Sequence, residues 1–303
     1  MAAGYCYCLG INSNAFFLND YKKAFILGLN VPKVTAYCIM SDLHIDVKRK
    51  PTSVEEFRIW MKAKFGYDEI FYPNYYGVAT KMLKDTFEKS PFWRALSSDF
   101  SSIDAEYKIK HNASLFSKNE IPEIFIKSLD SLLNKAYRKD VLNNENFPDP
   151  PKEGWVNQMD WFCGINDILR TTIVVKYLDG VEFLIGKIKD IAQSQNCTFE
   201  ASLEAREEGY YAAHLGVKQE LTLIDERYTP TSHLVNVEIQ ITTELQSLIK
   251  DLLHRYYEAN RIKHNVQNSK WQWDYLCDEF NSNYLGHIVH YVEGKIVELR
   301  DKQ

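Results

Sequence analysis

The chain has 303 residues, with 36 Lys and Arg against 41 Asp and Glu and a formal net charge of -5. Hydrophobic residues make up 45% and charged residues 25%, which excludes a mostly disordered chain. The mild acidity excludes a protein that coats nucleic acid through bulk charge, but a local basic pocket stays possible. No apolar run approaches the roughly 18 residues that span a membrane, and the first residues lack a basic leader. We therefore expect a cytoplasmic protein without a membrane partner.

The cysteines are scattered along the chain and form no CxxC pair. Cys6 and Cys8 come closest to a metal-binding spacing, but no CxxC or HxxxH motif completes a ligand set. We interpret all six as reduced structural thiols: Cys6, Cys8, Cys38, Cys163, Cys197 and Cys277.

The first region, residues 1–115, is rich in aromatic residues and in helical patterns. Residues 53–66 predict a helix, because Ser53 can act as its cap with Glu56 three residues later, and one apolar stripe follows: Phe57, Trp60 and Met61. A second helical pattern starts at residue 78 and ends near Pro91. We find no catalytic pattern here, so the role of this mainly helical region is left open.

Residues 120–140 predict an amphipathic helix. Their apolar stripe is Ile124, Leu129, Leu132, Leu133 and Ala136. Lys127, Ser131 and Lys135 step by four, so in such a helix they share another face. A proline-rich loop follows up to residue 155.

The pattern then changes to strands, at residues 167–178, 209–224 and 234–243, with helical patterns at 180–195 and 243–258. This order predicts an α/β region in which helices pack on a sheet. The last segment, 261–303, predicts a helical extension that packs on the body or on a partner through Tyr284, Ile288, Tyr291, Val292 and Val297.

Strand alternation places chemically diverse side chains on one face of the predicted sheet. In 234–243, Val235, Val237, Ile239 and Ile241 point one way, so Asn236, Glu238, Gln240 and Thr242 point the other. In 209–218 the polar face carries Tyr210, His214 and Lys218. Asp167 begins the preceding strand and can converge with Glu238 if the strands are neighbours. Two carboxylates with lysines suit Mg²⁺ and polyphosphate, and an exposed tyrosine can stack on a nucleobase.

Four motifs in this order resemble the synthetase domain of the RelA/SpoT alarmone synthetases. They are a Lys-x-x-x-Ser-x-x-x-Lys helix, a strand opening with Asp-Ile, a Gly-Tyr-x-x-x-His loop, and Val-Glu-Ile-Gln-Ile-x-Thr before a helix with His and Tyr. The matching residues are Lys127, Ser131 and Lys135, then Asp167 and Ile168, then Gly209, Tyr210 and His214, then 237–243 with His254 and Tyr257. The resemblance covers roughly residues 116–260 and implies an α+β nucleotidyltransferase-like domain with a mixed β-sheet flanked by helices.

The resemblance implies a pyrophosphokinase that transfers the β,γ-pyrophosphate of ATP to a 3′-hydroxyl with Mg²⁺. Its implied catalytic residues and metal ligands are Asp167 and Glu238. Its implied ATP site is Lys127, Ser131, Lys135, Arg138 and Arg170. Its implied acceptor site is Gly209, Tyr210, His214 and Gln240, with Tyr210 stacking on the acceptor base.

The chain departs from the family pattern at several basic positions. Phe125 and Thr242 stand where the family often has Arg, and Arg170 stands where Gly is usual with Thr172 at the usual Arg. Glu207 and Glu208 replace a Pro-Lys step and would repel the phosphates of a free guanine nucleotide. The departures favour similarity to the toxic small synthetases, whose acceptors include the 3′ end of tRNA or a purine nucleotide.

Three alternatives stay open. The chain is a toxin-type pyrophosphokinase, a (p)ppGpp synthetase that uses GDP or GTP, or a catalytically silent relative that binds nucleotide or tRNA. An antitoxin or another regulatory protein is a further expected partner. The residues around His44 do not form the paired His-Asp motif of the alarmone hydrolase domain, so we expect no hydrolase half. We interpret His287 and His290 as packing residues, and we expect five basic residues to be scattered unless they cluster in space: Arg206, Lys250, Arg255, Arg261 and Lys263.

Overall fold

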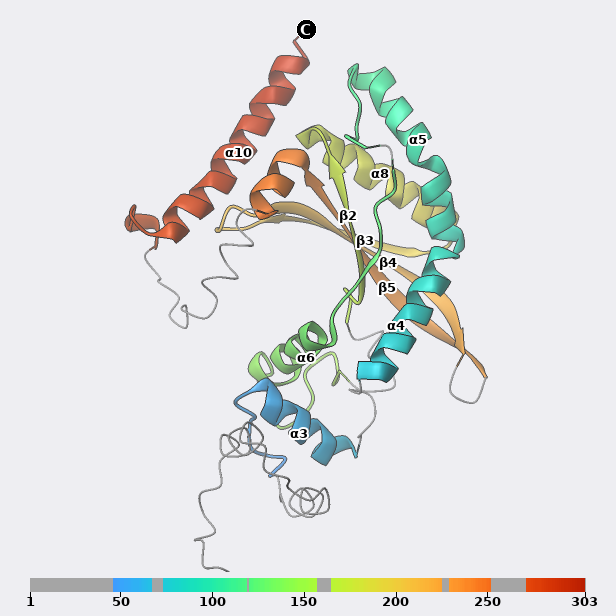
Figure 1. Ribbon diagram of the computed structural model, residues 1–303, viewed down its shortest axis with the longest axis vertical. Coiled ribbons are helices and arrows are strands. Elements are labelled where there is room, and N and C mark those ends of the chain that lie inside the picture. The colour runs from blue at the N-terminus through green and yellow to red at the C-terminus, as the bar shows by residue number, and fades with distance from the viewer. Residues whose placement is uncertain are drawn as a thin grey trace, which may run out of the picture. The chain divides into compact units, whose positions relative to one another are not determined.

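The computed structural model describes residues 46–66, 73–118, 120–156, 165–224, 229–251 and 271–302 (Figure 1). The described residues from Val47 onward form one compact unit. One hydrophobic cluster joins Phe57 and Leu83, from before residue 115, to Ile173 and Ile241 in the sheet. The helical segments before residue 115 thus contribute to the same core as the sheet, and the three-region division of the sequence stays a prediction.

A five-stranded mixed sheet forms the centre of this unit. Its strands run in the order β1-β2-β5-β4-β3, with β2 parallel to β5 and the other neighbours antiparallel. The predicted mixed sheet with flanking helices is confirmed. The strand bounds are β1 Phe125–Ile126, β2 Leu169–Val175, β3 Thr198–Ala205, β4 Tyr211–Ile224 and β5 Pro230–Thr243.

The helices before β2 include α3 Val54–Phe65, α4 Pro73–Glu88, α5 Pro91–His111 and, after β1, α6 Leu129–Tyr137, which continues as the π-helix η1 Arg138–Leu142. After β2 come α8 Leu178–Ser194, a helix at 244–251, the 3-10 turn η2 Trp271–Trp273 and α10 Asp278–Arg300. Ser53 caps α3 as predicted, because its hydroxyl accepts the Glu56 amide.

The two faces of the sheet differ as the alternation predicts. Val235, Val237, Ile239 and Ile241 are each at most 1% exposed and belong to the hydrophobic core. Helix α8 contacts β2 to β5, and α4 contacts β4. Core residues from these helices therefore cover the apolar face. The opposite face is left to polar side chains, and the site lies there.

The predicted helix at 120–140 is wrong in its first half. Phe125 and Ile126 form β1 instead, and Lys127 donates its amide to the Ile168 carbonyl at 2.8 Å. Helix α6 starts only after Ser128, whose hydroxyl accepts the Ser131 amide. Lys127 thus precedes the helix and does not share a helical face with Ser131 and Lys135. Pairing of β1 with β2 instead brings Lys127 beside the start of β2.

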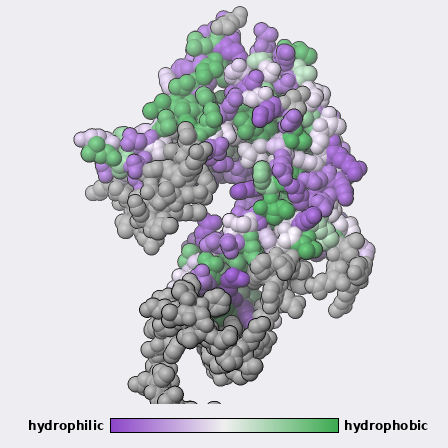
Figure 2. Space-filling model, viewed as in Figure 1, coloured by the Kyte–Doolittle hydropathy of each residue, from purple (hydrophilic) through white to green (hydrophobic). Residues whose placement is uncertain are grey.

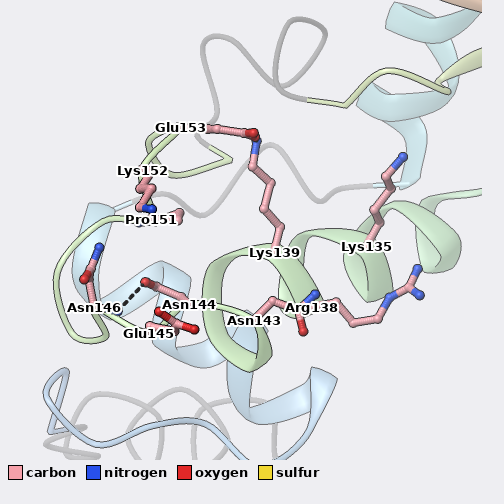
Figure 3. Close-up of a pocket in the computed structure, with 10 residues that line it drawn as sticks. All are labelled: Lys135, Arg138, Lys139, Asn143, Asn144, Glu145, Asn146, Pro151, Lys152 and Glu153. Carbon is pink, nitrogen blue, oxygen red and sulfur yellow. Dashed lines mark hydrogen bonds and ion pairs between the residues drawn. The ribbon is translucent and has the colours of Figure 1, made fainter. Parts of the chain in front are cut away.

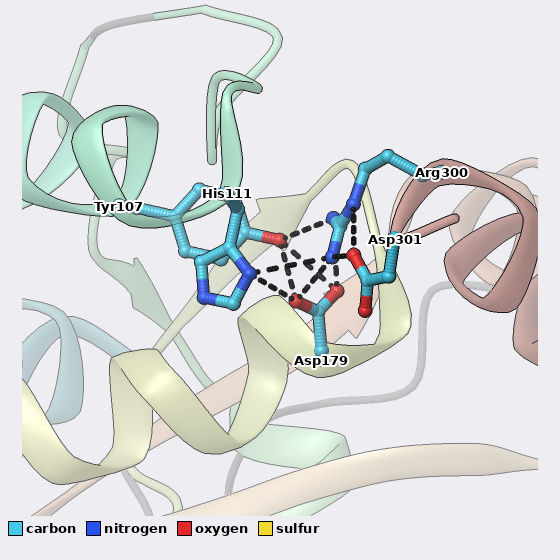
Figure 4. Close-up of polar contacts among 5 residues, drawn as sticks. All are labelled: Tyr107, His111, Asp179, Arg300 and Asp301. Carbon is cyan, nitrogen blue, oxygen red and sulfur yellow. Dashed lines mark hydrogen bonds and ion pairs between the residues drawn. The ribbon is translucent and has the colours of Figure 1, made fainter. Parts of the chain in front are cut away.

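The end of α10 is fixed to α5 and α8 by an ion-pair cluster (Figure 4). The Arg300 guanidinium donates to Tyr107 Oη and to Asp179 Oδ2, both at 2.9 Å, and His111 Nδ1 lies 3.4 Å from the same carboxylate. Burial opposes ionisation of Asp179, but the hydrogen bonds from Arg300 and Tyr107 lower its pKa below the ordinary value. The C-terminal helix is therefore part of the folded body.

Helix α10 contacts the body through small and polar side chains and exposes its large apolar ones. Its buried residues are Ser282, Asn283, Gly286 and Glu293. Figure 2 shows apolar side chains on the visible surface of this helix, and the most exposed are Ile288, Tyr291 and Leu299. No helix in the described part of the chain is long and apolar enough to cross a membrane.

Candidate active site

The Asp167 cluster consists of Asp167, Lys127 and Lys135 at one end of β2. Lys127 Nζ donates to Asp167 Oδ2 at 2.7 Å, and Lys135 Nζ donates to Asp167 Oδ1 at 2.8 Å. Burial raises the pKa of Asp167, but the hydrogen bonds and charges of both lysines outweigh it and lower the pKa below the ordinary value. The cluster holds one carboxylate and two ammonium groups, so it keeps a net positive charge that suits a polyanion.

Tyr76 supports this cluster from α4. Its hydroxyl donates to the Lys127 carbonyl at 2.6 Å, and its side chain is buried. Burial and the negative charge of Asp167 raise the pKa of Tyr76, so it stays a neutral donor. The sequence analysis missed this residue, because Tyr76 precedes Lys127 by 51 positions and belongs to no motif.

The Glu238 chain runs across β4 and β5 on the polar face of the sheet. It consists of Tyr210, His214, Glu238, Gln240 and Lys250. The Tyr210 hydroxyl lies 3.0 Å from His214 Nε2, and His214 Nδ1 lies 3.5 Å from Glu238 Oε1. The Gln240 amide donates to the same Glu238 oxygen at 2.5 Å, and Lys250 Nζ donates to Gln240 Oε1 at 3.4 Å. The predicted polar face therefore forms one connected row of hydrogen-bonding groups.

Glu238 is held in its ionised form. Burial raises its pKa, but the hydrogen bonds from His214 and Gln240 outweigh burial and lower the pKa below the ordinary value. The charge of Asp167 acts in the opposite direction and raises the pKa of Glu238. Arg170, the second residue of β2, is paired in register with Glu238 on the neighbouring parallel strand β5.

Asp167 and Glu238 fit the requirements of a magnesium site that a substrate completes. Mg²⁺ usually keeps several waters and is bound through one or two carboxylates together with substrate phosphates. No group of three or more His, Cys, Asp or Glu side chains with metal-ligating geometry occurs in the described residues. The described residues therefore contain no site in which protein side chains alone would surround a metal ion.

Two basic residues that we expected to be scattered approach Tyr210. The Arg206 guanidinium lies 5.2 Å from the Tyr210 ring centroid, and Lys250 Nζ lies 6.0 Å from it. Surrounding protein atoms lower the pKa of Lys250, and the charge of Arg170 lowers it further. The other three residues of that set, Arg255, Arg261 and Lys263, lie outside the described residues.

The loop that carries Tyr210 is held by α10. Gly209 has φ +74°, and a Cβ at this position would lie 2.2 Å from the Asn283 carbonyl oxygen. His287 Nε2 lies 2.9 Å from the Glu207 carbonyl, and its Nδ1 lies 2.8 Å from the Tyr211 hydroxyl. Glycine is therefore required at position 209 for close approach of α10. The packing role that we predicted for His287 is confirmed, and its partner is this loop.

A cavity of about 600 Å³ opens beside the Asp167 cluster between α6, η1 and the loop up to residue 153 (Figure 3). Lys135 and Arg138 line it together with Lys139, which pairs with Glu153 at 3.1 Å. Asp140 lies behind it, fully buried, and accepts the Val156 amide at 3.1 Å. Burial raises the pKa of Asp140 to about 6. The cavity is rich in cations and shares Lys135 with the Asp167 cluster.

No family model matches the sequence, and no curated protein matches it. Among solved structures, the chain is similar to small alarmone synthetase 2 from Bacillus subtilis, with 18% identity and a TM-score of 0.48, over 74% of this chain and 98% of that one.

Two further solved structures show the same kind of similarity. A GTP pyrophosphokinase family protein from Streptococcus pneumoniae matches with 16% identity and a TM-score of 0.44, over 72% of this chain and 93% of that one. Small alarmone synthetase 1 from Bacillus subtilis, bound to its product pppGpp, matches with 19% identity and a TM-score of 0.44, over 72% and 96%.

The structure brings together most of the predicted site residues. Lys127 and Lys135 meet at Asp167, while four residues join in the Glu238 chain: Tyr210, His214, Glu238 and Gln240. Ser131 is exposed, and its hydroxyl accepts from Ser128 rather than facing Asp167. Arg138 lines the cavity beside Lys135. The remaining motif residues, His254 and Tyr257, and the pair Cys6 and Cys8 lie outside the described residues.

Proposed function

We propose that this protein is a Mg²⁺-dependent pyrophosphokinase that transfers the β,γ-pyrophosphate of ATP to a 3′-hydroxyl. The observation that carries the proposal is a pair of carboxylates with lowered pKa values, Asp167 just before β2 and Glu238 on the parallel neighbour β5. Two lysines hold one carboxylate, whereas a histidine and an amide hold the other. This asymmetry suits a reaction that joins a polyanionic donor to an uncharged hydroxyl.

The Asp167 cluster would bind the donor. Lys127 and Lys135 can turn from Asp167 to the phosphates of ATP without a change in backbone, because both reach it through flexible side chains. Arg138 and the cavity beside Lys135 offer further positive charge to the triphosphate. Mg²⁺ bound at Asp167 and Glu238 would neutralise charge on the phosphate oxygens during transfer.

The Glu238 chain would bind and activate the acceptor. Tyr210 offers a ring for stacking of the acceptor base. The Glu238 carboxylate accepts the proton of the 3′-hydroxyl as the hydroxyl oxygen attacks the β-phosphorus of ATP. The bond from that phosphorus to the α–β bridging oxygen breaks, and AMP leaves. His214 and Gln240 keep Glu238 oriented throughout, since both contact the same oxygen. Positioning and charge neutralisation thus carry most of the catalysis.

For the acceptor we favour a tRNA 3′ end or a purine nucleotide, and with it a growth-inhibiting role. Glu207 and Glu208 are exposed beside Tyr210, where they disfavour the dense charge of a free guanosine tri- or diphosphate. A (p)ppGpp synthetase is the alternative acceptor chemistry at the same site.

The test is a transfer assay with γ-labelled ATP, Mg²⁺ and one acceptor per reaction: GDP, GTP, AMP, ADP or bulk tRNA. Glu238→Gln removes the base and a metal ligand without changing side-chain size, so we expect loss of transfer by about 1,000-fold with retained ATP binding. Glu200→Gln, at an exposed position of β3, is the matched control and should keep full activity.

Full activity in the Glu238→Gln protein would overturn the assignment. Label on a guanine nucleotide would replace the favoured acceptor by the (p)ppGpp alternative. If wild-type protein binds nucleotide with Mg²⁺ but transfers no label to any acceptor, the protein is a silent binding relative.

A further inference from the structure

Two cations beside the polar face of the sheet have no carboxylate partner among the residues that the structure describes. Lys127 and Lys135 share Asp167, and Arg206 pairs with Glu204 at 3.2 Å. For Lys250 and Arg170, by contrast, no ion pair with any described residue is present. Within the described part of the chain, these two cations are therefore not neutralised by an ion pair.

Both cations face the Glu238 chain. Arg170 lies on β2 directly across from Glu238 in the β2–β5 register, on the face that alternation assigns to the site. Lys250 projects from the helix that follows β5, contacts Gln240 at 3.4 Å and approaches the Tyr210 ring. They therefore approach the predicted acceptor position from two different elements.

Like charges held near each other raise the energy of the site until an anion arrives. Burial is the main cause that lowers the pKa of Lys250; the charge of Arg170 lowers it further, and the charges of Asp251 and Glu238 act against this. Gln240 offers Lys250 only a neutral amide oxygen, which cannot offset that repulsion. A bound anion would interact favourably with both groups, since charge-assisted hydrogen bonds are about twice as strong as neutral ones.

The identity of the anion follows from the neighbours. The ATP phosphates belong at the Asp167 cluster in the proposed function. A nucleotide that stacks on Tyr210 and turns its 3′-hydroxyl to Glu238 carries its charge at one other place on the ribose, the phosphate on the 5′ oxygen. We infer that Lys250 and Arg170 form the subsite for the 5′-phosphate of the acceptor nucleotide. This inference rests on the proposed function and names which acceptors the site accepts.

This subsite would serve two sources of the same chemistry, a free nucleotide and the last nucleotide of an RNA 3′ end. In both, one phosphate sits on the 5′ oxygen of the acceptor nucleoside. The subsite also accounts for the loss of a basic residue at position 242. Thr242 is buried there, and its uncharged hydroxyl donates to the Tyr211 carbonyl. Lys250 supplies a cation to the face where the family pattern has Arg at position 242.

The experiment measures binding without turnover. The full chain with Mg²⁺ and an ATP analogue that has a methylene α–β bridge is titrated calorimetrically with AMP, GMP, adenosine and guanosine. We expect a monophosphate to bind at least about tenfold more tightly than its nucleoside. In Lys250→Ala and in Arg170→Gln this ratio should approach one. Lys250→Ala should leave the affinity for the nucleoside and for the ATP analogue unchanged, whereas a weaker affinity for the analogue in Arg170→Gln would reflect the ATP-site role that the sequence predicts for Arg170. Lys250→Arg should preserve the ratio.

Lys218→Ala is the matched control, because Lys218 is a strand lysine on the same face that pairs with Glu200 at 2.7 Å. It should leave the ratio unchanged. A short RNA with a CCA end is titrated alongside, and a loss of affinity in Lys250→Ala for the RNA, for AMP and GMP, or for both supports the subsite and identifies the source.

A ratio that stays as in the wild type in both Lys250→Ala and Arg170→Gln overturns the inference, as does failure of every acceptor compound to bind beside the analogue. The two proposals fail separately. If the transfer assay is negative but the ratio still collapses in the variants, the pyrophosphokinase proposal falls and the phosphate subsite stands.

Discussion

The Asp167 cluster and the Glu238 chain face each other across two neighbouring strands, yet they are built in opposite ways. The first joins one carboxylate to two lysines through short ion pairs. The second surrounds its carboxylate with a histidine and an amide, and its only lysine contacts the amide. Charge is concentrated in one half and diluted in the other. A polyanion suits the first half, and a hydroxyl with a stacked base suits the second.

The two halves also differ in what supports them. The Asp167 cluster comes from β1, α6 and the start of β2, and Tyr76 of α4 supports it. The Glu238 chain depends on a loop that α10, near the C-terminal end of the chain, holds through Gly209 and His287. Donor binding and acceptor binding should therefore be separable by mutation. The predictions below test that separation.

The largest expected effect is on the donor half. Asp167→Asn removes a metal-ligating charge and leaves Lys127 and Lys135 without their shared partner. We expect transfer to fall by about 100- to 1,000-fold, with weaker Mg²⁺-dependent binding of ATP and unchanged binding of the acceptor. Steady-state kinetics and calorimetric titration of ATP measure this.

Asp190→Asn, at an exposed position of α8, is the control for loss of a carboxylate and should behave as the wild type. Equal weakening of acceptor and donor binding in Asp167→Asn would contradict the separation of the two halves.

A smaller effect is expected on the acceptor half through α10. A Cβ at Gly286 would lie 2.1 Å from the Gly209 carbonyl oxygen, so Gly286→Ala must displace the helix or the loop. A displacement of about 1 Å can cost about 100-fold in rate, so we expect kcat/KM for the acceptor to fall by between ten- and 100-fold with an unchanged KM for ATP.

Gly294→Ala is a close control, because it lies on the same helix and its Cβ would meet no heavy atom within 4 Å. It should retain activity and gain about 0.5–1 kcal/mol of stability, as Ala favours a helix over Gly. Unchanged acceptor kinetics in Gly286→Ala with unchanged thermal stability would show that α10 does not position the loop.

Much of the polar face follows from strand alternation, which needs no knowledge of tertiary contacts. A period of two placed Glu238 and Gln240 opposite the buried Val237 and Ile239, and the structure confirms it. Helical periodicity was wrong at Lys127, because the apolar residue Ile124 fits the helical stripe although its segment forms a strand. The Ser128-x-x-Ser131 cap was the local signal for the true helix start.

Other site residues could not come from patterns at all. Tyr76 reaches the site from a helix 51 positions before Lys127, and it belongs to no spacing that indicates chemistry. Lys250 lies only ten positions after Gln240, but no pattern within the sequence shows that its side chain turns back to that residue. Glu293 of α10 is buried against Thr243, a contact that no single-segment pattern contains. Such contacts depend on how elements pack, and a sequence read one segment at a time does not specify that packing.

The smallest expected effect concerns the foundation of the donor half and should appear in stability rather than in the reaction. Asp140 is buried below the cavity with a pKa of about 6, against an ordinary 3.8. Between pH 3.8 and about 6, the Asp140 carboxyl is mostly protonated in the native state and mostly ionised in the unfolded state. The free energy of unfolding therefore falls as pH rises from about 4 to 6, by at most about 3 kcal/mol for this group.

Asp140→Asn removes that titration while its amide oxygen can still accept the Val156 amide. We expect the variant to gain stability relative to the wild type as pH rises from 4 to 7, with a constant difference above about pH 7. Urea denaturation at a series of pH values measures it. Any unpaired N–H of the new amide adds a cost that is equal at every pH, so it cancels in the change of that difference with pH. Parallel stability curves for the two proteins would contradict the raised pKa and show that Asp140 is ionised in the folded protein.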